Sequence, residues 1–151
     1  MANGNRLIIP ALGGLYGALA PLADLIVRVT VGFLLIPHGS QKLFGLFGGG
    51  GLEGTAQFLA STGFTPGLFW AVLIGCTEFF GGLCLVLGLL TRPAAAAVTV
   101  FMAVAVFHHW PVWFWPQGGL EMPLLWGLMA LSILIRGGGR FSLDAAIGRE
   151  F

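Results

Sequence analysis

The chain has 151 residues, of which 57% are hydrophobic and only 9% are charged, and its mean hydropathy is +0.93. A soluble domain ordinarily carries about 25% charged residues, so this composition excludes an ordinary water-soluble globular protein. Seven Lys and Arg against six Asp and Glu give a net charge of +1, which leaves no basic surface for nucleic acid. The composition predicts a protein of the lipid bilayer.

Four apolar segments, separated by turn residues, predict an all-α bundle of four transmembrane helices. Crossing the hydrocarbon core takes about 20 apolar residues, and the fourth segment is the shortest of the four. Thr65-Pro66 suits a helix start, Thr91-Arg92-Pro93 predicts a tight turn, and the glycines at 137–139 predict a helix end. The predicted spans cover residues 21–41, 66–90, 93–110 and 120–135.

Residues 7–20 form a further apolar run with features of a secretory signal, since Arg6 precedes it and Ala18-Leu19-Ala20 ends it. Pro10 and Pro21 bracket the run, and its glycines weaken it as a spanning helix. We therefore expect it to remain uncleaved, as a short separate helix lying in the membrane interface.

The first connection, residues 43–65, predicts a short amphipathic helix on the outer surface. Leu52, Ala56 and Leu59 recur on one helical face there. The chain thus divides into an N-terminal interfacial segment, a four-helix transmembrane domain and a C-terminal cytoplasmic tail. The three parts cover residues 1–20, 21–136 and 137–151.

The basic residues and the tryptophans predict the orientation. Four spans put both termini and the second connection on one side, which holds five basic residues, whereas Lys42 stands on the other. The positive-inside bias then predicts a multi-pass protein of the bacterial inner membrane with both termini in the cytoplasm, and an aromatic belt marks the opposite face. The residues concerned are Arg6, Arg92, Arg136, Arg140 and Arg149 on the cytoplasmic side, and Trp70, Trp110, Trp113 and Trp115 on the outer side.

Two charged residues fall deep inside the predicted spans, where a charge costs roughly 2.5–3.5 kcal/mol. Arg28 lies in the first span and Glu78 in the second, at depths that differ by only a few ångström, at about 1.5 Å per residue. We expect them to form an ion pair near the midplane, which either relays protons or only locks the helix packing. Gly75 and Gly82 share the face of Glu78 and would admit another helix.

A second group of polar side chains gathers at the outer ends of the spans. Histidine and lysine can hydrogen-bond the oxygens of a lipid-soluble quinone, and Glu or His can exchange its protons. In the alternatives without a bound ligand, Lys42 extends to the lipid headgroups, and at most one of His108 and His109 faces the bundle. The candidate quinone-binding residues are His38, Gln41, Lys42, His108 and Glu121.

The cysteines indicate neither a disulfide nor a metal site. Cys76 and Cys84 are eight residues apart, about 12 Å along a helix, which is too far for a disulfide. The sequence has no zinc-ligand spacing, no haem-attachment motif and no iron–sulfur cysteine set. We therefore predict no metal and no intrinsic cofactor, so that electron transfer would need a partner.

Six segments share a recognisable pattern: Arg28–Gly45, Gly51–Gly54 with Phe58, Thr77–Gly82, Gly88–Pro93, Glu121–Ile135 and Gly139–Asp144. Together they resemble the DoxX family of small four-helix membrane proteins, over nearly the whole chain from about residue 21. The aromatic stretch His108–Trp115 departs from the family pattern. Some members are named as subunits of terminal quinol oxidases or of thiosulfate:quinone oxidoreductase. The site residues that the resemblance implies are His38, Lys42, Glu78 and Glu121.

The leading hypothesis is an accessory subunit of a quinone- or quinol-linked membrane redox complex, which is catalytic only as part of that complex. In this hypothesis the outer polar residues hold the headgroup, while Glu78 and Arg28 assist proton movement. The alternative is a purely structural or assembly subunit of a larger membrane complex, and a small proton or solute transporter comes third. The expected partners are the lipid bilayer and other membrane protein subunits.

Overall fold

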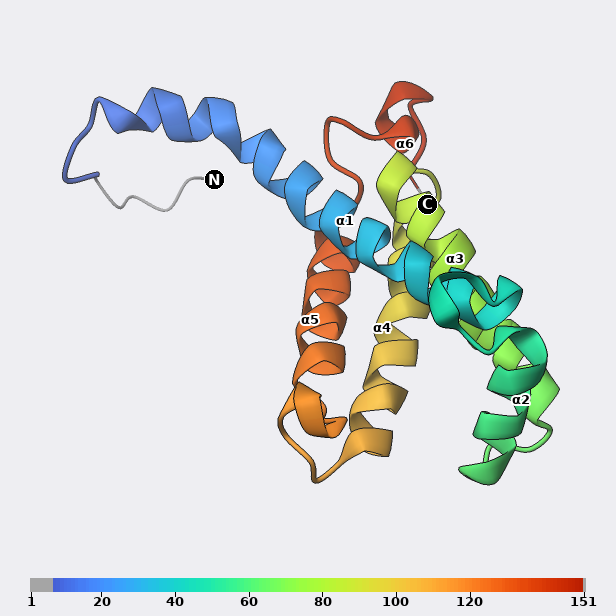
Figure 1. Ribbon diagram of the computed structural model, residues 1–151. Helices are drawn as coiled ribbons and strands as arrows, with labels where there is room; N and C mark the ends of the chain where they lie inside the picture. Colours follow the sequence, from blue (N-terminus) through green and yellow to red (C-terminus); the bar gives the residue numbers. More distant parts are fainter. Residues whose placement is uncertain (1–6, 151) are drawn as a thin grey trace.

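The computed structural model describes residues 7–150, and this part of the chain is all-α (Figure 1). Within it, six α-helices follow one another, with short 3-10 turns at Leu46–Gly48 and Trp115–Gln117. The helices are α1 (Leu12–Phe44), α2 (Gly51–Ser61), α3 (Gly67–Leu87), α4 (Thr91–His109), α5 (Glu121–Arg136) and α6 (Leu143–Ala146).

Three helices, α1, α3 and α4, are long and apolar enough to cross a membrane, with 33, 21 and 19 residues. This finding confirms the prediction of a helical membrane protein. The fifth helix, α5, has 16 residues and is roughly 24 Å long, which is shorter than the hydrocarbon core of about 30 Å.

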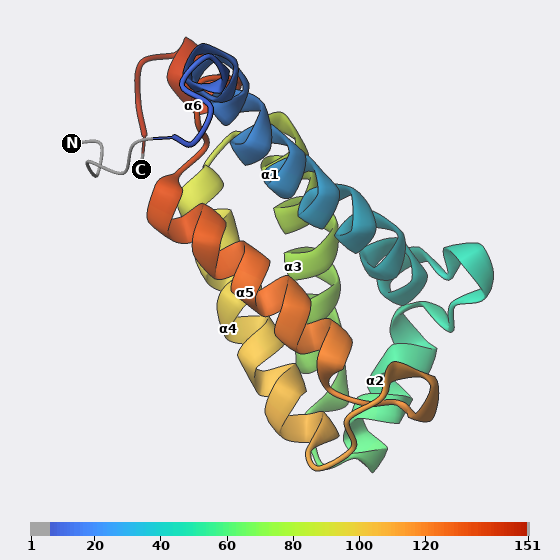
Figure 2. The ribbon, with the colours of Figure 1, turned by 90° about the vertical axis from the view of Figure 1, so that its left-hand side faces the viewer.

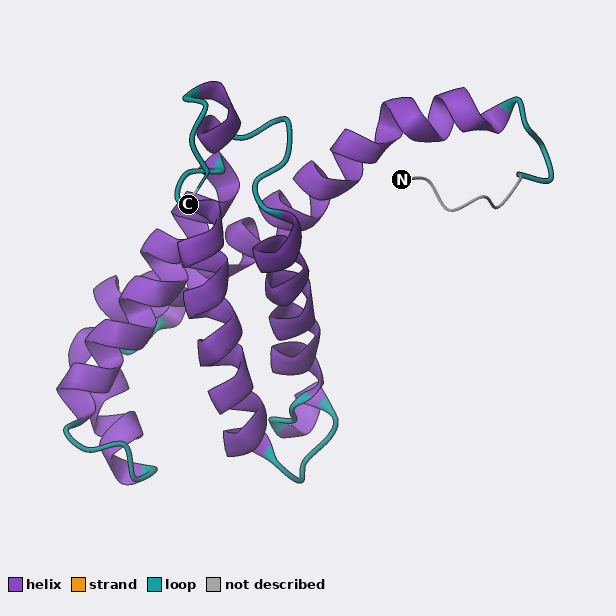
Figure 3. Ribbon diagram, turned by 180° about the vertical axis from the view of Figure 1, so that it is seen from behind, coloured by secondary structure: helices purple, strands orange, loops and turns teal. Residues whose placement is uncertain are grey.

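The first helix is continuous, so the prediction of a separate interfacial helix ending before the first span is wrong. Pro21 lies inside α1, where a proline removes one backbone hydrogen bond and bends a helix without having to end it. Figures 1 and 3 show the first turns of α1 projecting away from the other helices. Arg6 lies outside the described residues.

The turn between α3 and α4 lies slightly earlier than predicted. Gly88 and Leu90 have positive φ angles of 68° and 49°, and Thr91 already begins α4. Pro93 is accommodated because the first turn of a helix does not need its backbone N–H. Within residues 7–150 no side chain caps the start of α3, so Thr65 is not its cap. Gly137 ends α5 as predicted.

Glycines let α1 and α3 approach backbone to backbone. A Cβ added at Gly32 would lie 2.5 Å from the carbonyl oxygen of Gly82, and one at Gly82 would lie 2.8 Å from the carbonyl oxygen of Gly32. Gly39 faces the backbone of Phe79 in the same way, and Gly75 faces Leu43. The predicted close helix approach beside Glu78 is confirmed, and the helix that approaches is α1.

The short helix α2 confirms the predicted amphipathic helix in the first connection. It packs against α3 and more lightly against α1. Leu59 is buried in this contact, whereas Glu53 and Gln57 are exposed.

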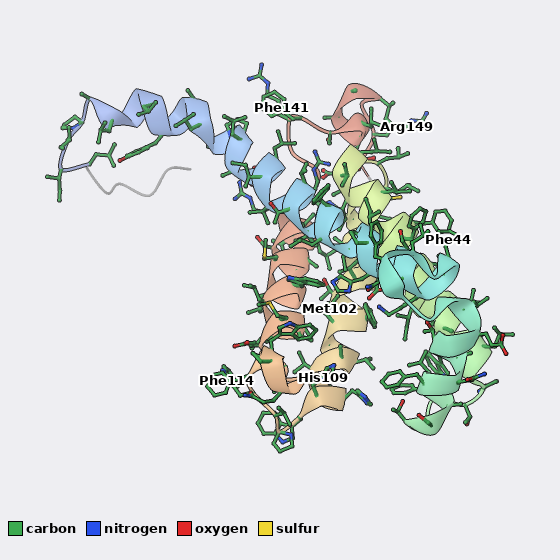
Figure 4. The ribbon with its side chains drawn as sticks, viewed as in Figure 1. Phe44, Met102, His109, Phe114, Phe141 and Arg149 are labelled. Atoms are coloured by element: carbon green, nitrogen blue, oxygen red, sulfur yellow. The ribbon has the colours of Figure 1, made fainter. Side chains whose placement is uncertain are left out.

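The bundle has two different ends. One end holds the α3–α4 turn and α6, and we call it the tail end; the other holds α2 and the α4–α5 connection, and we call it the loop end (Figures 1 and 2). Arg149 and Phe114 mark the two ends in Figure 4. The hydrophobic core extends from the tail end to the middle of the bundle. It consists of Val31, Leu35, Leu85, Ala94, Ala95, Val98, Met102, Ala130 and Ile133.

Candidate functional site

Lys42 and Glu78 form an ion pair between α1 and α3. The Lys42 ammonium donates to both carboxylate oxygens, with Nζ 2.9 Å from Oε1 and 2.7 Å from Oε2. The Glu78 side chain is only 5% exposed and that of Lys42 is 28% exposed. Because both oxygens accept from one ammonium, the charge of this deeply placed carboxylate is compensated.

The prediction that Arg28 pairs with Glu78 is therefore wrong. The helices α1 and α3 run antiparallel, and the contacts of Gly32 with Gly82 and of Gly39 with Phe79 fix their register. In this register Lys42 lies opposite Glu78, whereas Arg28 lies near the C-terminal end of α3. Depth counted from the predicted span ends could not show this register.

Arg28 instead bonds to backbone carbonyl groups at the tail end. Its Nη1 donates to the carbonyls of Leu85 and Val86, the latter at 3.0 Å, and its Nη2 donates to the carbonyl of Phe141 at 2.6 Å. The last carbonyls of a helix have no partner within the helix, and a cation there is favoured by the helix dipole. Arg28 thus joins α1, the end of α3 and the C-terminal tail.

Asp144 completes this arrangement. Its Oδ1 accepts from the backbone N–H of Leu90 and its Oδ2 from that of Thr91, both at 2.9 Å. It thereby caps the start of α4, whose first N–H groups need external acceptors. We call Arg28, Asp144 and the backbone groups that they bond the Arg28 cluster.

The ionisation of Asp144 is coupled to these bonds. Burial alone raises the pKa of the Asp144 carboxyl, but the hydrogen bonds from Thr91 and Leu90 and the positive charge of Arg28 outweigh it. The net result is a pKa below the ordinary value of 3.8, because these groups favour the ionised form.

An apolar cavity of about 840 Å³ occupies the loop-end half of the bundle. The polar residues of its lining are His38, Lys42, Thr77, Glu78, His108 and His109. We call Lys42, Glu78 and His38 the Lys42 cluster. Most of the remaining lining is apolar and comes from α2, α3, α4 and α5. It includes Leu59, Phe64, Trp70, Leu73, Ile74, Ala97, Val100, Phe101, Met102, Val104, Met122 and Trp126.

His38 lies against the indole of Trp126, with the two rings edge to face and 5.3 Å between their centroids. Among residues 7–150, no hydrogen bond is made by either of its ring nitrogens. The Lys42 ammonium has three N–H donors, and its side-chain bonds in the same part of the chain go to Glu78 alone. Both side chains therefore retain donors for a ligand in the cavity.

The structure brings only part of the predicted outer group together. His108 and its neighbour His109 both contribute to the cavity lining, and His108 is exposed whereas His109 is half-buried. Gln41 is not among the lining residues, because its amide turns to the carbonyl of Phe47, 3.2 Å away. Glu121 is also absent from the lining, because its Oε1 accepts from the backbone N–H of Trp115 at 2.8 Å.

Two parts of this site are not predicted from the sequence: the pairing of Glu78 with Lys42 and the contact of Trp126 with His38. The glycine pattern on α3 predicts that a helix comes close to this carboxylate, but not that Lys42 of α1 lies opposite it. Cys76 and Cys84 are both free, which agrees with their spacing.

The family comparison matches the DoxX family over residues 23–110. The chain belongs to the DoxX family. The match runs from α1 to the end of α4 and includes the Lys42 cluster, whereas Glu121 and Asp144 lie beyond it.

Among relatives of this DoxX protein, the inner membrane protein YphA of Escherichia coli is 29% identical over 137 residues, covering 85% of this chain and 93% of YphA. An uncharacterised protein of Haemophilus influenzae is 30% identical over 127 residues, covering 78% of this chain and 85% of that protein. A Bacillus subtilis protein named "Putative oxidoreductase CatD" is 35% identical over 71 residues, 47% of each chain. No solved structure matches the chain. The name of YphA and the three long apolar helices indicate a multi-pass protein of the inner membrane.

Proposed function

We propose that this DoxX protein binds the headgroup of a membrane quinone beside the Lys42 cluster, as an accessory subunit of a quinone-linked redox complex. The observation that carries the proposal is an ion pair and a histidine with unused donors in the wall of an apolar cavity of about 840 Å³. Cavities of this size with a few converging polar groups are typical of small-molecule sites.

The chemistry of the three side chains suits a quinone. The two quinone oxygens are hydrogen-bond acceptors, and Lys42 and His38 offer donors. Reduction to the quinol takes two electrons and two protons, and Glu78 and the imidazole are groups that can exchange protons with it. The electrons would come from a haem, flavin or iron–sulfur centre on a partner subunit. The name of the CatD relative, an oxidoreductase, supports a redox role.

In this proposal α5 is the fourth span, and both termini lie in the cytoplasm. The 16 residues of α5 suffice if the bilayer thins locally or its flanking polar residues extend to the surface. The tail end then faces the cytoplasm, and the cavity lies in the outer half of the membrane. The basic residues that support this orientation are Arg92, Arg136, Arg140 and Arg149.

Quinone binding can be measured on the purified protein in lipid nanodiscs. The probe is 2,3-dimethoxy-5-methyl-1,4-benzoquinone, a headgroup without a chain, and the signal is quenching of tryptophan fluorescence. Three of the five tryptophans, Trp70, Trp115 and Trp126, line the cavity. We expect saturable quenching in the wild type.

Two variants test whether the Lys42 cluster holds the headgroup. His38→Leu and the double variant Lys42→Met/Glu78→Met should each weaken binding at least about tenfold, which corresponds to about 1.4 kcal/mol. Gln41→Met is the matched control, because Gln41 is on the same turn of α1 but outside the cavity lining. Quenching that is absent, or equal in all four proteins, would refute the proposed site.

A further inference from the structure

We infer that the cavity opens sideways into the bilayer between α3 and α4, and that the apolar chain of the bound quinone leaves through this lateral opening. The inference rests on the proposed function, because the headgroup beside the Lys42 cluster is what places the chain. It adds a substrate class, quinones with a long alkyl or isoprenoid chain, and a route of entry.

The exposure of the cavity lining locates the opening. Leu73 of α3 and Val104 of α4 both line the cavity and are 46% exposed, and Val100 of α4 is 67% exposed. A side chain can line the cavity and also be exposed only where the wall of the cavity is incomplete. Since α3 and α4 are long enough to span the membrane, exposed residues in the middle of these helices face hydrocarbon and not water.

The packing of the helices explains why the wall is incomplete there. The most extensive contacts of α3 are with α1, and those of α4 are with α5, whereas α3 and α4 contact each other less. Figures 1 and 3 show α3 and α4 diverging from the Gly88–Leu90 turn toward the loop end. Ala96 and Ala97 line the cavity on α4, and their small side chains leave the space between the helices unfilled.

The opening and the Lys42 cluster together define an amphiphilic ligand. The Lys42 cluster lies at one place in the cavity, and an apolar part of the lining with Leu73, Val100 and Val104 leads to the lipid. A chain in this opening is in apolar surroundings before and after binding, so it adds little affinity. Its effect is geometric, because a headgroup that carries a long chain can bind only if the chain has an exit.

The test compares two quinones that differ only in the chain. These are the chainless benzoquinone used above and its decyl derivative, with concentrations expressed as mole fractions in the nanodisc lipid. In the wild type we expect similar dissociation constants for the two. Ala97→Phe, which places a large side chain in the opening, should weaken the decyl quinone at least tenfold and change the chainless quinone less than about twofold.

Ala103→Phe provides the matched control. Ala103 is an exposed alanine on the same helix that does not line the cavity, and its substitution should leave both constants unchanged. Equal effects of Ala97→Phe on both quinones, or no effect on the decyl quinone, would overturn the lateral opening while the headgroup site stands. The same conclusion follows if His38→Leu no longer binds the chainless quinone while Ala97→Phe affects the two quinones equally.

Other occupants of the opening give different results. If neither quinone binds the wild type, the proposed function and this inference both fail. Native mass spectrometry of the protein released from nanodiscs detects a phospholipid that stays bound. A bound phospholipid that saturating decyl quinone does not displace would assign the opening to a phospholipid chain and overturn the inference.

Discussion

The two ends of the helical bundle hold buried charges in different ways. At the tail end, Arg28 and Asp144 bond to backbone groups of α3, α4 and the tail. At the loop end, Lys42 and Glu78 bond to each other beside a cavity. Backbone partners cannot be exchanged without unwinding a helix, whereas a side-chain pair can accept a new partner. A charge inside a membrane helix therefore indicates a ligand site only where donors remain unused beside a cavity.

The largest effect should come from breaking the α1–α3 crossing, on which both clusters depend. Gly32→Val puts side-chain atoms against the backbone of Gly82, which cannot move aside. We expect a loss of at least about 3 kcal/mol in the free energy of unfolding, measured by SDS titration in mixed micelles. Gly14→Val on the same helix meets nothing of residues 7–150 within 4 Å and should cost much less; equal losses would show that the crossing is not what stabilises the bundle.

The two clusters should respond differently to removal of their charges. Arg28→Met leaves the carbonyls of Val86 and Phe141 without their donor, so we expect a loss of about 2–3 kcal/mol. The double variant Lys42→Met/Glu78→Met removes both members of a pair and should change stability by less than about 1 kcal/mol. The same SDS titration measures both, and a double variant as unstable as Arg28→Met would contradict the contrast between the two ends.

Acid should weaken the Arg28 cluster by a smaller amount. The bonds to Asp144 hold its pKa below the ordinary value of 3.8 in the folded protein, so their stabilisation is present at higher pH, where this carboxyl is ionised in both the folded and the unfolded state. It is lost as the pH falls through the folded-state pKa, when the carboxylate takes up a proton. We expect this contribution to disappear in the wild type as the pH falls below the ordinary carboxyl value of 3.8, and to be absent in Asp144→Asn.

Thermal unfolding at a series of pH values checks this prediction. Glu53→Gln changes an exposed carboxylate on α2 and should follow the wild-type curve. An Asp144→Asn curve with the full wild-type acid sensitivity would mean that other groups govern the acid response.

The helices could be predicted from the sequence because their limits are set locally. Apolar runs and turn residues predicted α3, α4 and α5 to within a few residues, and the pattern of Leu52, Ala56 and Leu59 predicted α2. The expected end of a helix at Pro21 is wrong, because a proline permits a break in a helix but does not require one. The apolar residues on both sides of Pro21 continue α1.

The site could be predicted only in part. The depth of a residue along a helix follows from its position in the sequence, whereas the rotation of the helix and its register with a neighbouring helix depend on packing. His38, Lys42 and His108 lie at the cavity, as the helix directions require. Gln41 is at the same depth but turns to Phe47, and Glu121 bonds within its own loop. The partner of Glu78 depends on glycine contacts between helices, and no single segment of the chain contains that information.

The bond from Arg28 to the carbonyl of Phe141 joins residues 113 positions apart. The ribosome synthesises Arg28 long before this acceptor and Asp144 exist, so the growing chain carries a guanidinium in its first helix without its full set of partners. Chains that end prematurely never acquire them. A shortened copy thus keeps only the carbonyls of Leu85 and Val86 as acceptors for this guanidinium, and its Nη2 lacks the acceptor that the tail supplies.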